Sequence, residues 1–317
     1  MNETVRRLRC FGGEVAIRVG GQGRDGTTAA LAALLAEARL RDVHRRLSRF
    51  DRASELSQLN AADQEVVLAS RLLRDLARAV VAAGERSDGL VDATRLQDLE
   101  RAGYAASRDG LDGLALAEAL ADAPVPAAAG PHPSASWRQI RVDDFDRTIT
   151  RPRGVRIDGG GLAKGLAADL VAARLAAHPT FAIDCAGDVR IGGSARLPRS
   201  VRVEDPFDAT GPPLHEFEVV DGAAATSSIG RRSWRNADGR PAHHIIDPAT
   251  GQPAWTGVVQ ATALAPTALE AEILAKSALL AGVERGHELL RHGGVLVLAD
   301  LSVEIVPAAA ALQLSVT

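Results

Sequence analysis

The residues of this sequence best suited to chemistry lie in one short stretch, Asp158-Gly-Gly-Gly-Leu-Ala-Lys164-Gly165. The β-branched residues of 155–157 predict a strand before it, and an Ala/Leu-rich pattern over about 162–177 predicts a helix after it. Glycines let the backbone approach a phosphate, a helix N-terminus offers unpaired N–H groups, and Lys164 adds a full positive charge. Asp158 is suited to accept a hydrogen bond from a ribose or an adenine, or to lie near a metal.

The same spacing also fits an ordinary strand–helix turn with a surface lysine, because glycine turns before helices are common. It matches neither the dinucleotide fingerprint G-x-G-x-x-G nor the phosphate-binding loop G-x-x-x-x-G-K-[ST]. On spacing alone, both interpretations of the stretch stay open.

Other polar or small-residue stretches offer further candidates. Asn60 ends the polar run Ser54-Glu-Leu-Ser-Gln-Leu-Asn60, where it either holds a loop in place or points at a ligand. The stretch Gly222–Ser228 suits either close approach of a flat ligand or tight packing. His244 follows a predicted strand end and precedes an Asp-Pro turn.

The surrounding sequence predicts strands and helices in alternation. Helices are expected over 27–49, 70–83, 162–177, 267–280 and 283–291, with a short helical turn in 54–60. Strands are expected over 11–19, 137–142, 148–151, 155–157, 180–193, 201–206, 214–220, 258–265, 295–299 and 302–306. Ser54 or Asp51, Ser70 and Thr267 are the expected N-terminal caps, and Gly282 is the expected helix stop. The buried stripe of the first helix is predicted to comprise Leu31, Leu34, Leu35, Ala38, Val43 and Leu47.

This order of elements, with short connections, predicts the α+β class (mixed α/β) in one compact unit. A single domain is expected over 1–317, with about 105–135 as a variable loop region rich in Ala, Asp, Gly and Pro.

Composition excludes several classes of protein. The 317 residues carry a net charge of −3 and a pI near 6.3, so we expect no nucleic-acid partner. Cys10 and Cys185, the two cysteines, form neither a disulfide framework nor a metal-site spacing. No signal peptide or apolar run of membrane-spanning length is recognisable, so we expect a cytoplasmic protein without a membrane anchor.

Taken together, the motifs resemble the ApbE-like FAD:protein FMN transferases over about residues 10–300. The resemblance depends on the order of motifs that are weak individually. They are Ser54–Asn60, Gly89-Leu-Val-Asp92, Asp158–Gly165, Asp184-Cys-Ala-Gly187-Asp188, Glu204-Asp-Pro206, Ala225-Thr226-Ser227 and His244-Ile-Ile-Asp-Pro-Ala-Thr-Gly251.

The resemblance implies an ApbE-like (T-fold-like) domain with mixed sheets and packed helices. It also implies that the protein binds FAD and Mg²⁺, cleaves the diphosphate with release of AMP, and attaches FMN to a threonine or serine of a target protein. Such a reaction needs positioning and charge neutralisation more than covalent help, and a metal would bridge the phosphate oxygens.

By position in these motifs, a set of residues is expected to contact FAD. They are Phe11, Phe50, Leu90, Val91, Asp92, Asp158, Lys164 and Ile246. Asn60 is expected to shape the same site and is grouped with the catalytic residues. His244 is a candidate base for the acceptor hydroxyl, with a structural histidine bonded to a neighbouring carbonyl as the alternative.

The metal site is where the sequence departs from the family. The family's Asp and Thr on the late helix are replaced by Glu272 and Lys276, while Gly161 stands where a main-chain oxygen binds the metal. Glu272 can ligate Mg²⁺, but Lys276 cannot while it is charged. Lys276 either replaces part of the metal's charge near the phosphates or pairs with Glu272, and an exposed helix pair of no functional consequence is the third interpretation.

Two alternatives to transfer follow from this departure. One is an FAD-binding protein whose transfer activity is impaired by the altered metal site. The other is an FAD pyrophosphatase that releases free FMN, with water in place of the threonine.

Overall fold

An antiparallel sheet organises this computed structural model, which describes residues 2–108, 111 and 113–309. Its strand order is β1-β2-β6-β7-β10-β13-β14-β15. Its strands are β1 Glu3–Cys10, β2 Gly13–Gly20, β6 Thr180–Cys185, β7 Asp188–Gly192, β10 Gly222–Ser228, β13 Val258–Ala265, β14 Gly294–Leu298 and β15 Val303–Val306. Every position of β13 is buried, as its small and apolar residues require in the middle of a sheet.

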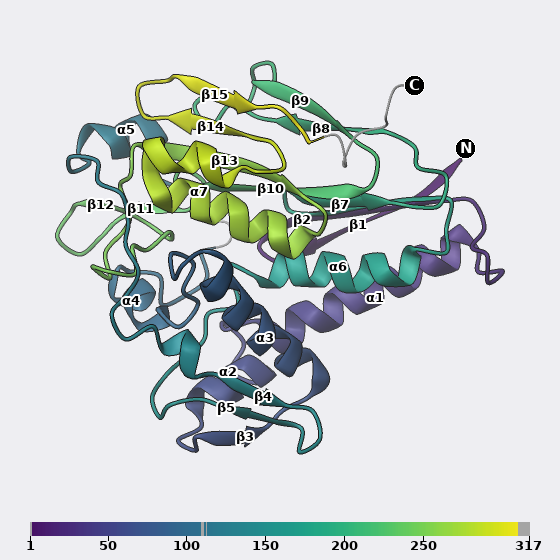
Figure 1. The fold of residues 1–317 in the computed structure, drawn as a ribbon, viewed down its shortest axis with the longest axis horizontal. Helices are drawn as coiled ribbons and strands as arrows, with labels where there is room; N and C mark the ends of the chain where they lie inside the picture. The colour runs from purple at the N-terminus through teal and green to yellow at the C-terminus, as the bar shows by residue number, and fades with distance from the viewer. Residues whose placement is uncertain (1, 109–110, 112, 310–317) are drawn as a thin grey trace.

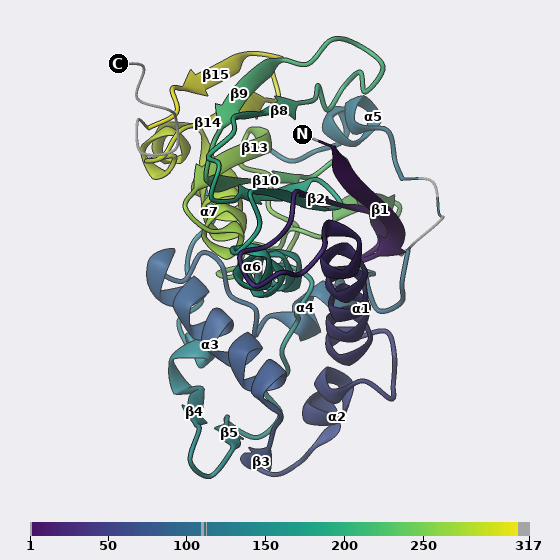
Figure 2. The ribbon, with the colours of Figure 1, turned by 90° about the vertical axis from the view of Figure 1, so that its right-hand side faces the viewer.

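Helices cover one face of this sheet. The helices on this face are α1 Ala29–Leu47, α6 Ala163–Leu175 and α7 Ala268–Leu289. The other helices lie outside this layer: α2 Glu55–Ala61, α3 Arg71–Arg86, α4 Leu96–Arg101 and α5 Leu116–Ala121, with a 3₁₀ turn, η1, at Ser136–Gln139. In Figures 1 and 2, α6 and α7 lie side by side against the sheet, and α1 lies next to α6. The α+β class expected from the sequence is confirmed.

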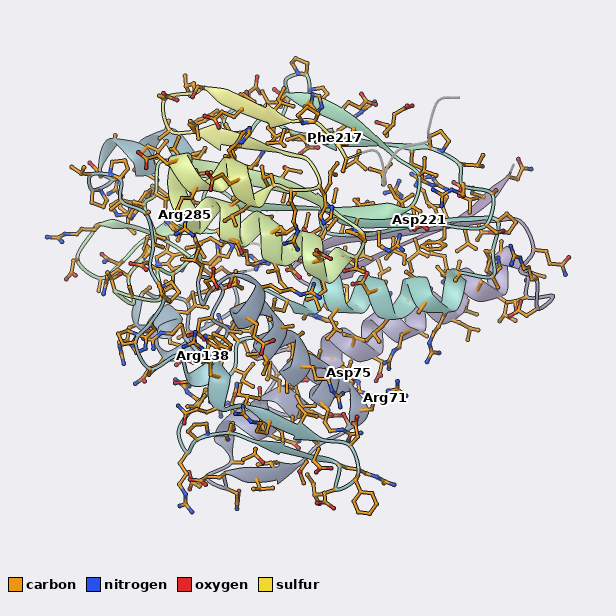
Figure 3. All side chains as sticks on the ribbon, viewed as in Figure 1. Arg71, Asp75, Arg138, Phe217, Asp221 and Arg285 are labelled. Carbon is orange, nitrogen blue, oxygen red and sulfur yellow. The ribbon has the colours of Figure 1, made fainter. Side chains whose placement is uncertain are left out.

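Smaller sheets flank these layers. They are β3 Val66–Leu68, β5 Thr148–Thr150 and β4 Arg141–Asp143; β8 Arg199–Val203 with β9 His215–Val219; and β11 Ser233–Arg235 with β12 Pro241–His243. Figure 1 shows the β3–β5–β4 sheet beneath α2 and α3, far from the main sheet. Figure 3 shows side chains filling the space between the layers. The side chain of Arg71, at the start of α3, is 89% exposed and points to solvent.

Several local predictions are confirmed. The side chains of Ser54, Ser70 and Thr267 each accept a hydrogen bond from a backbone N–H in the first turn of their helix. Gly282, at φ 80°, interrupts α7 where the helix was expected to stop. No helix in the described ranges has the length and apolar character needed to cross a membrane.

The predicted buried stripe of α1 is wrong in its first half. Leu31, Leu34 and Leu35 are about half exposed, and Ala38 is exposed too. The buried face instead comprises Ala32, Ala33, Ala36, Leu40, Val43 and Leu47. Alanines without bulk let α1 approach the sheet closely, whereas the prediction favoured leucine over alanine by hydrophobicity alone.

Several strand predictions also need correction. The first half of the strand expected over 137–142 is the 3₁₀ turn η1, and the stretch expected over 180–193 is the antiparallel pair β6 and β7. The segment 155–157 pairs with no strand in the described structure; the Asn60 amide bonds the Ile157 backbone, and Arg156 pairs with Glu100. Phe11, expected to start a strand, lies in the β1–β2 turn at φ 53°. The expected extent of 1–317 includes residues 1 and 310–317, and the variable region includes 109, 110 and 112; these positions lie outside the described residues.

Candidate functional site

A cavity of about 400 Å³ opens where the start of α6 meets α7, β10 and the segments that follow α1 and α3. A volume of this size is typical of sites for small molecules. The expected site residues that line it are Phe11, Phe50, Leu90, Val91, Asp92, Asp158, Gly161, Lys164, His244, Ile246, Glu272 and Lys276. Segments far apart in the sequence therefore meet at one place.

Asn60 does not line this cavity. Its Nδ2 donates to the Ile157 carbonyl and its Oδ1 accepts from the Ile157 N–H, each at 2.8 Å. The catalytic grouping of Asn60 is corrected accordingly: its amide replaces a strand neighbour for the segment that leads into the glycine turn. Of the two roles left open by the sequence, the geometry favours holding a loop.

The glycine turn is held from both sides. The N–H of Asp158 donates to the Ala93 carbonyl at 2.8 Å, and the Gly159 carbonyl accepts from the first residues of α6. A Cβ at Gly159 would lie 3.3 Å from Leu56 Cδ2 and 3.4 Å from the Leu47 carbonyl oxygen, so the turn packs closely against the end of α1. Gly160 is exposed and has its nearest neighbours in the Asp158 carboxylate.

Lys164 follows the turn with its ammonium at the cavity wall. It pairs with Asp188 Oδ2 at 2.5 Å, and its side chain is 21% exposed. Burial lowers the pKa of Lys164, but the carboxylates of Asp188 and Glu272 outweigh burial and raise it above 10.5. The ammonium is therefore charged at neutral pH and positioned for an anionic ligand.

Helix α7 supplies a second ammonium, Lys276, beside the turn. Glu272 is fully buried; its Oε2 accepts from the Gly165 N–H at 3.0 Å, and its Oε1 lies 3.2 Å from Lys276 Nζ. Asp169 on α6 accepts from the N–H groups of Ala268 and Leu269, which caps α7. The two helices are thus fixed to each other at the cavity.

These residues do not fit a Mg²⁺ site. Both Glu272 oxygens already have partners, and the Lys276 ammonium takes the place of a cation beside them. A Cβ at Gly161 would lie 3.0 Å from Lys276 Cε, so the lysine side chain lies against the residue expected to supply the main-chain ligand. Within the described ranges, no three His, Cys, Asp or Glu residues form a group able to hold a metal. The expectation of Mg²⁺ at Gly161 and Glu272 is not supported by this geometry.

His244 lies at the cavity wall beside the basic residues. Its Nδ1 is 3.3 Å from the Arg232 carbonyl oxygen, which can only accept, so Nδ1 carries the proton of the neutral ring. Burial, followed by the charge of Arg232, lowers the pKa of His244 well below 6.5. Its Nε2 is therefore an unprotonated nitrogen at neutral pH.

An aromatic wall formed by Phe50, Arg49 and Tyr104 borders the cavity; Phe50 was expected there, whereas Arg49 and Tyr104 were not. Arg49 lies between two rings, 4.1 Å from the centroid of Phe50 and 4.6 Å from that of Tyr104, and its Nε is 3.1 Å from Asp158. The sequence signal for it is Phe50, with an arginine immediately before it. The wall offers flat surfaces suited to a ring system.

The remaining expected contacts line the same cavity. Leu90 and Val91 are buried, and the Asp92 carboxylate accepts from the N–H and hydroxyl of Thr94. Ile246 forms an isolated bridge with Pro253.

Basic side chains outnumber acidic ones around the cavity. The basic residues are Arg49, Arg95, Arg108, Lys164, Arg231, Arg232 and Lys276, and the acidic ones are Asp92, Asp158 and Glu272. The arrangement can bind a ligand that combines a flat ring with at least two negative charges.

Comparison with known proteins identifies relatives of this chain in sequence and in structure. The model of the ApbE family matches residues 11–299. An FAD:protein FMN transferase of Treponema pallidum is 34% identical over 154 residues, which is 44% of this chain and 41% of that protein. One of Escherichia coli K12 is 32% identical over 101 residues, 32% of this chain and 28% of that protein. The matched stretches therefore span less than half of either relative.

A solved structure matches over nearly the whole length of both chains. The crystal structure of the ApbE protein of Thermotoga maritima superimposes with a TM-score of 0.77 at 25% identity, covering 96% of this chain and 97% of that one.

Proposed function

The chain belongs to the ApbE family, and from this premise we propose that it is a flavin transferase that binds FAD in the cavity and moves its FMN part to a target protein. The relatives matched in sequence carry the name FAD:protein FMN transferase. The observation that carries the proposal is the meeting of Lys164 and Lys276 at one cavity, which the Gly159–Gly161 turn and an aromatic wall also line. Two ammonium groups together with an aromatic wall suit a molecule with a diphosphate and two ring systems.

Each part of FAD has a counterpart in the cavity. The ammonium groups of Lys164 and Lys276 and the exposed Gly160 would face the diphosphate, since anions favour charged donors near a helix N-terminus. Phe50, Leu90 and Val91 would contact a ring, and Asp92 or Asp158 would accept from hydroxyl groups.

The transfer step follows from these positions. The hydroxyl oxygen of a threonine or serine in the target forms a bond to the FMN phosphorus, and the anhydride bond to AMP breaks. The hydroxyl proton goes to His244 Nε2, and AMP leaves with the anhydride electrons. The lysines stabilise the charge that develops on the leaving phosphate. No role for Mg²⁺ is part of this proposal, because the residues do not fit one.

Incubation with FAD and a lysate of cells lacking the gene tests the proposal. AMP is measured by chromatography, and flavin that survives denaturation is located on a protein band and assigned to a residue by mass spectrometry. We expect AMP release together with FMN on a threonine or serine. AMP release with free FMN alone indicates a pyrophosphatase, and FAD retention without AMP indicates a binding protein; either result rejects transfer.

A further inference from the structure

The use of lysine in this sequence is unusual. Of the 37 lysine and arginine residues, Lys164 and Lys276 alone are lysines, and both line the cavity. Every other basic position, on the surface and in ion pairs, carries arginine. A guanidinium is planar and broad, whereas an ammonium is a compact point charge with three donors. Both lysines therefore lie at the cavity, where a compact charge suits an anionic ligand.

Lys276 is held by the carboxylate of Glu272, both of whose oxygens have hydrogen-bond partners. Glu272 is fully buried, its Oε2 is bonded to the Gly165 N–H, and its Oε1 is bonded to the Lys276 ammonium. A buried carboxylate without its cation would be strongly unfavourable, so Glu272 fixes the ammonium where it is. An exposed helix pair of the ordinary kind is thereby excluded, because the Lys276 side chain is only 16% exposed.

The side chain of Lys276 also lies over the glycine turn. A Cβ at Gly161 would approach Lys276 Cε to 3.0 Å, so this glycine leaves room for the lysine arm. The ammonium has three donors, and Glu272 is the one hydrogen-bond partner found for it among the described residues. Two donors are thus left for a ligand in the cavity.

We propose that the Lys276 ammonium is a built-in cation that takes the place of a divalent metal at the diphosphate. This inference rests on the proposed function, since it concerns the diphosphate of FAD. The ammonium supplies one positive charge where Mg²⁺ would supply two. Arg231 and Arg232 line the same cavity, and neither lies within 4 Å of a carboxylate in the described structure, so they can supply the remainder. FAD binding and anhydride cleavage then proceed without added metal.

Titration of flavin fluorescence with the purified protein, in excess EDTA and in excess MgCl₂, tests this inference without depending on turnover. We expect the wild-type affinity for FAD to agree within about twofold between the two conditions. Lys276→Met keeps the length of the arm and removes its charge, so affinity should fall about tenfold, as expected for losing a hydrogen bond between charged groups. AMP release is measured in parallel and should persist in EDTA.

Two further variants sharpen the test. Arg285→Met removes a positive charge from the exposed part of the same helix, marked in Figure 3, and should leave FAD affinity unchanged. The double variant Glu272→Asp with Lys276→Thr exchanges the ammonium for oxygen ligands, and its FAD affinity should become dependent on MgCl₂ by about tenfold.

The outcomes separate the two proposals. Wild-type binding of FAD that requires MgCl₂ overturns the built-in cation while leaving the flavin transferase intact. Equal loss of affinity in Lys276→Met and Arg285→Met also overturns it. No FAD binding in either condition rejects the proposed function itself, and the inference with it.

Discussion

The N–H of Gly165 donates to Glu272 Oε2 at 3.0 Å, so the first turn of α6 and the second turn of α7 share one buried carboxylate. Lys164 immediately precedes this glycine, and Lys276 follows Glu272 by one helical turn. The backbone positions that carry the two ammonium groups are therefore held by one helix–helix contact.

A Gly165→Ala substitution should disturb this contact. The added Cβ would lie 2.7 Å from both the Ala268 carbonyl oxygen and Leu269 Cα, and backbone atoms cannot swing aside. We expect the free energy of unfolding to fall by about 1–3 kcal/mol, measured by urea denaturation. Gly230→Ala is the control, because its Cβ would meet Leu116 side-chain carbons at an ordinary 3.4 Å. Equal losses in the two variants would contradict a tight α6–α7 contact.

The buried His243 should make the protein sensitive to acid. Burial lowers its pKa from 6.5 to about 3, so below pH 6.5 the unfolded chain takes up a proton that the native state refuses. The free energy of unfolding should therefore decrease as pH falls from 6.5 towards 3, by up to about 1.4 kcal/mol per pH unit for this residue.

His243→Phe tests this origin of the acid sensitivity. The ring stays against Trp255, which it meets edge-on at 4.7 Å, but it no longer titrates. The variant loses the bond from the Ile245 N–H at every pH, so the slope of stability against pH is the informative quantity. We expect a shallower slope than in the wild type; an unchanged slope would assign the acid sensitivity to other groups, among them His244.

The contacts of Arg49 with two rings and with Asp158 should depend on its guanidinium group. A lysine there cannot stack between Phe50 and Tyr104 while it also reaches Asp158. Arg49→Lys should lower the free energy of unfolding by about 1–2 kcal/mol and weaken FAD binding. Arg138→Lys is the control: this exposed arginine, labelled in Figure 3, lies over the single ring of Trp137, outside the cavity. A matching loss in Arg138→Lys would show that the sandwich has no special role.

His244→Gln should separate binding from transfer. If Nε2 takes the acceptor proton, AMP release should slow by about 10²–10⁴-fold while FAD affinity changes little. Because the pKa of His244 is lowered, the neutral ring persists at neutral pH, and kcat/KM should decline only on the acid side of pH 6.5. Undiminished turnover in the variant would leave His244 with a structural role.

The sequence predicts the positions of most helices and strands because their signals are local. Caps such as Ser70 and Thr267 and the break at Gly282 depend on residues within a few positions. The inward face of α1 was missed because it depends on how closely a helix can approach the sheet, which Ala33 and Ala36 permit.

The sequence predicted which residues form the site better than it predicted how they interact. Motif order brought Lys164, His244 and Glu272 together, but partners from distant segments were beyond any local pattern. Asp188 beneath Lys164 and the amide of Asn60 on Ile157 join segments separated by long stretches of chain. The Lys276–Glu272 spacing showed that the two could pair, and the structure adds that the pair is buried.

The central claim is that the cavity binds FAD through its diphosphate, between Lys164 and Lys276. Its most direct test compares the affinities of the wild type for FAD and for riboflavin, which lacks both phosphates, by flavin fluorescence. We predict that FAD binds at least about a hundredfold more tightly, and that the double variant Lys164→Met with Lys276→Met loses most of this preference. Equal affinity of the wild type for the two flavins would contradict the claim.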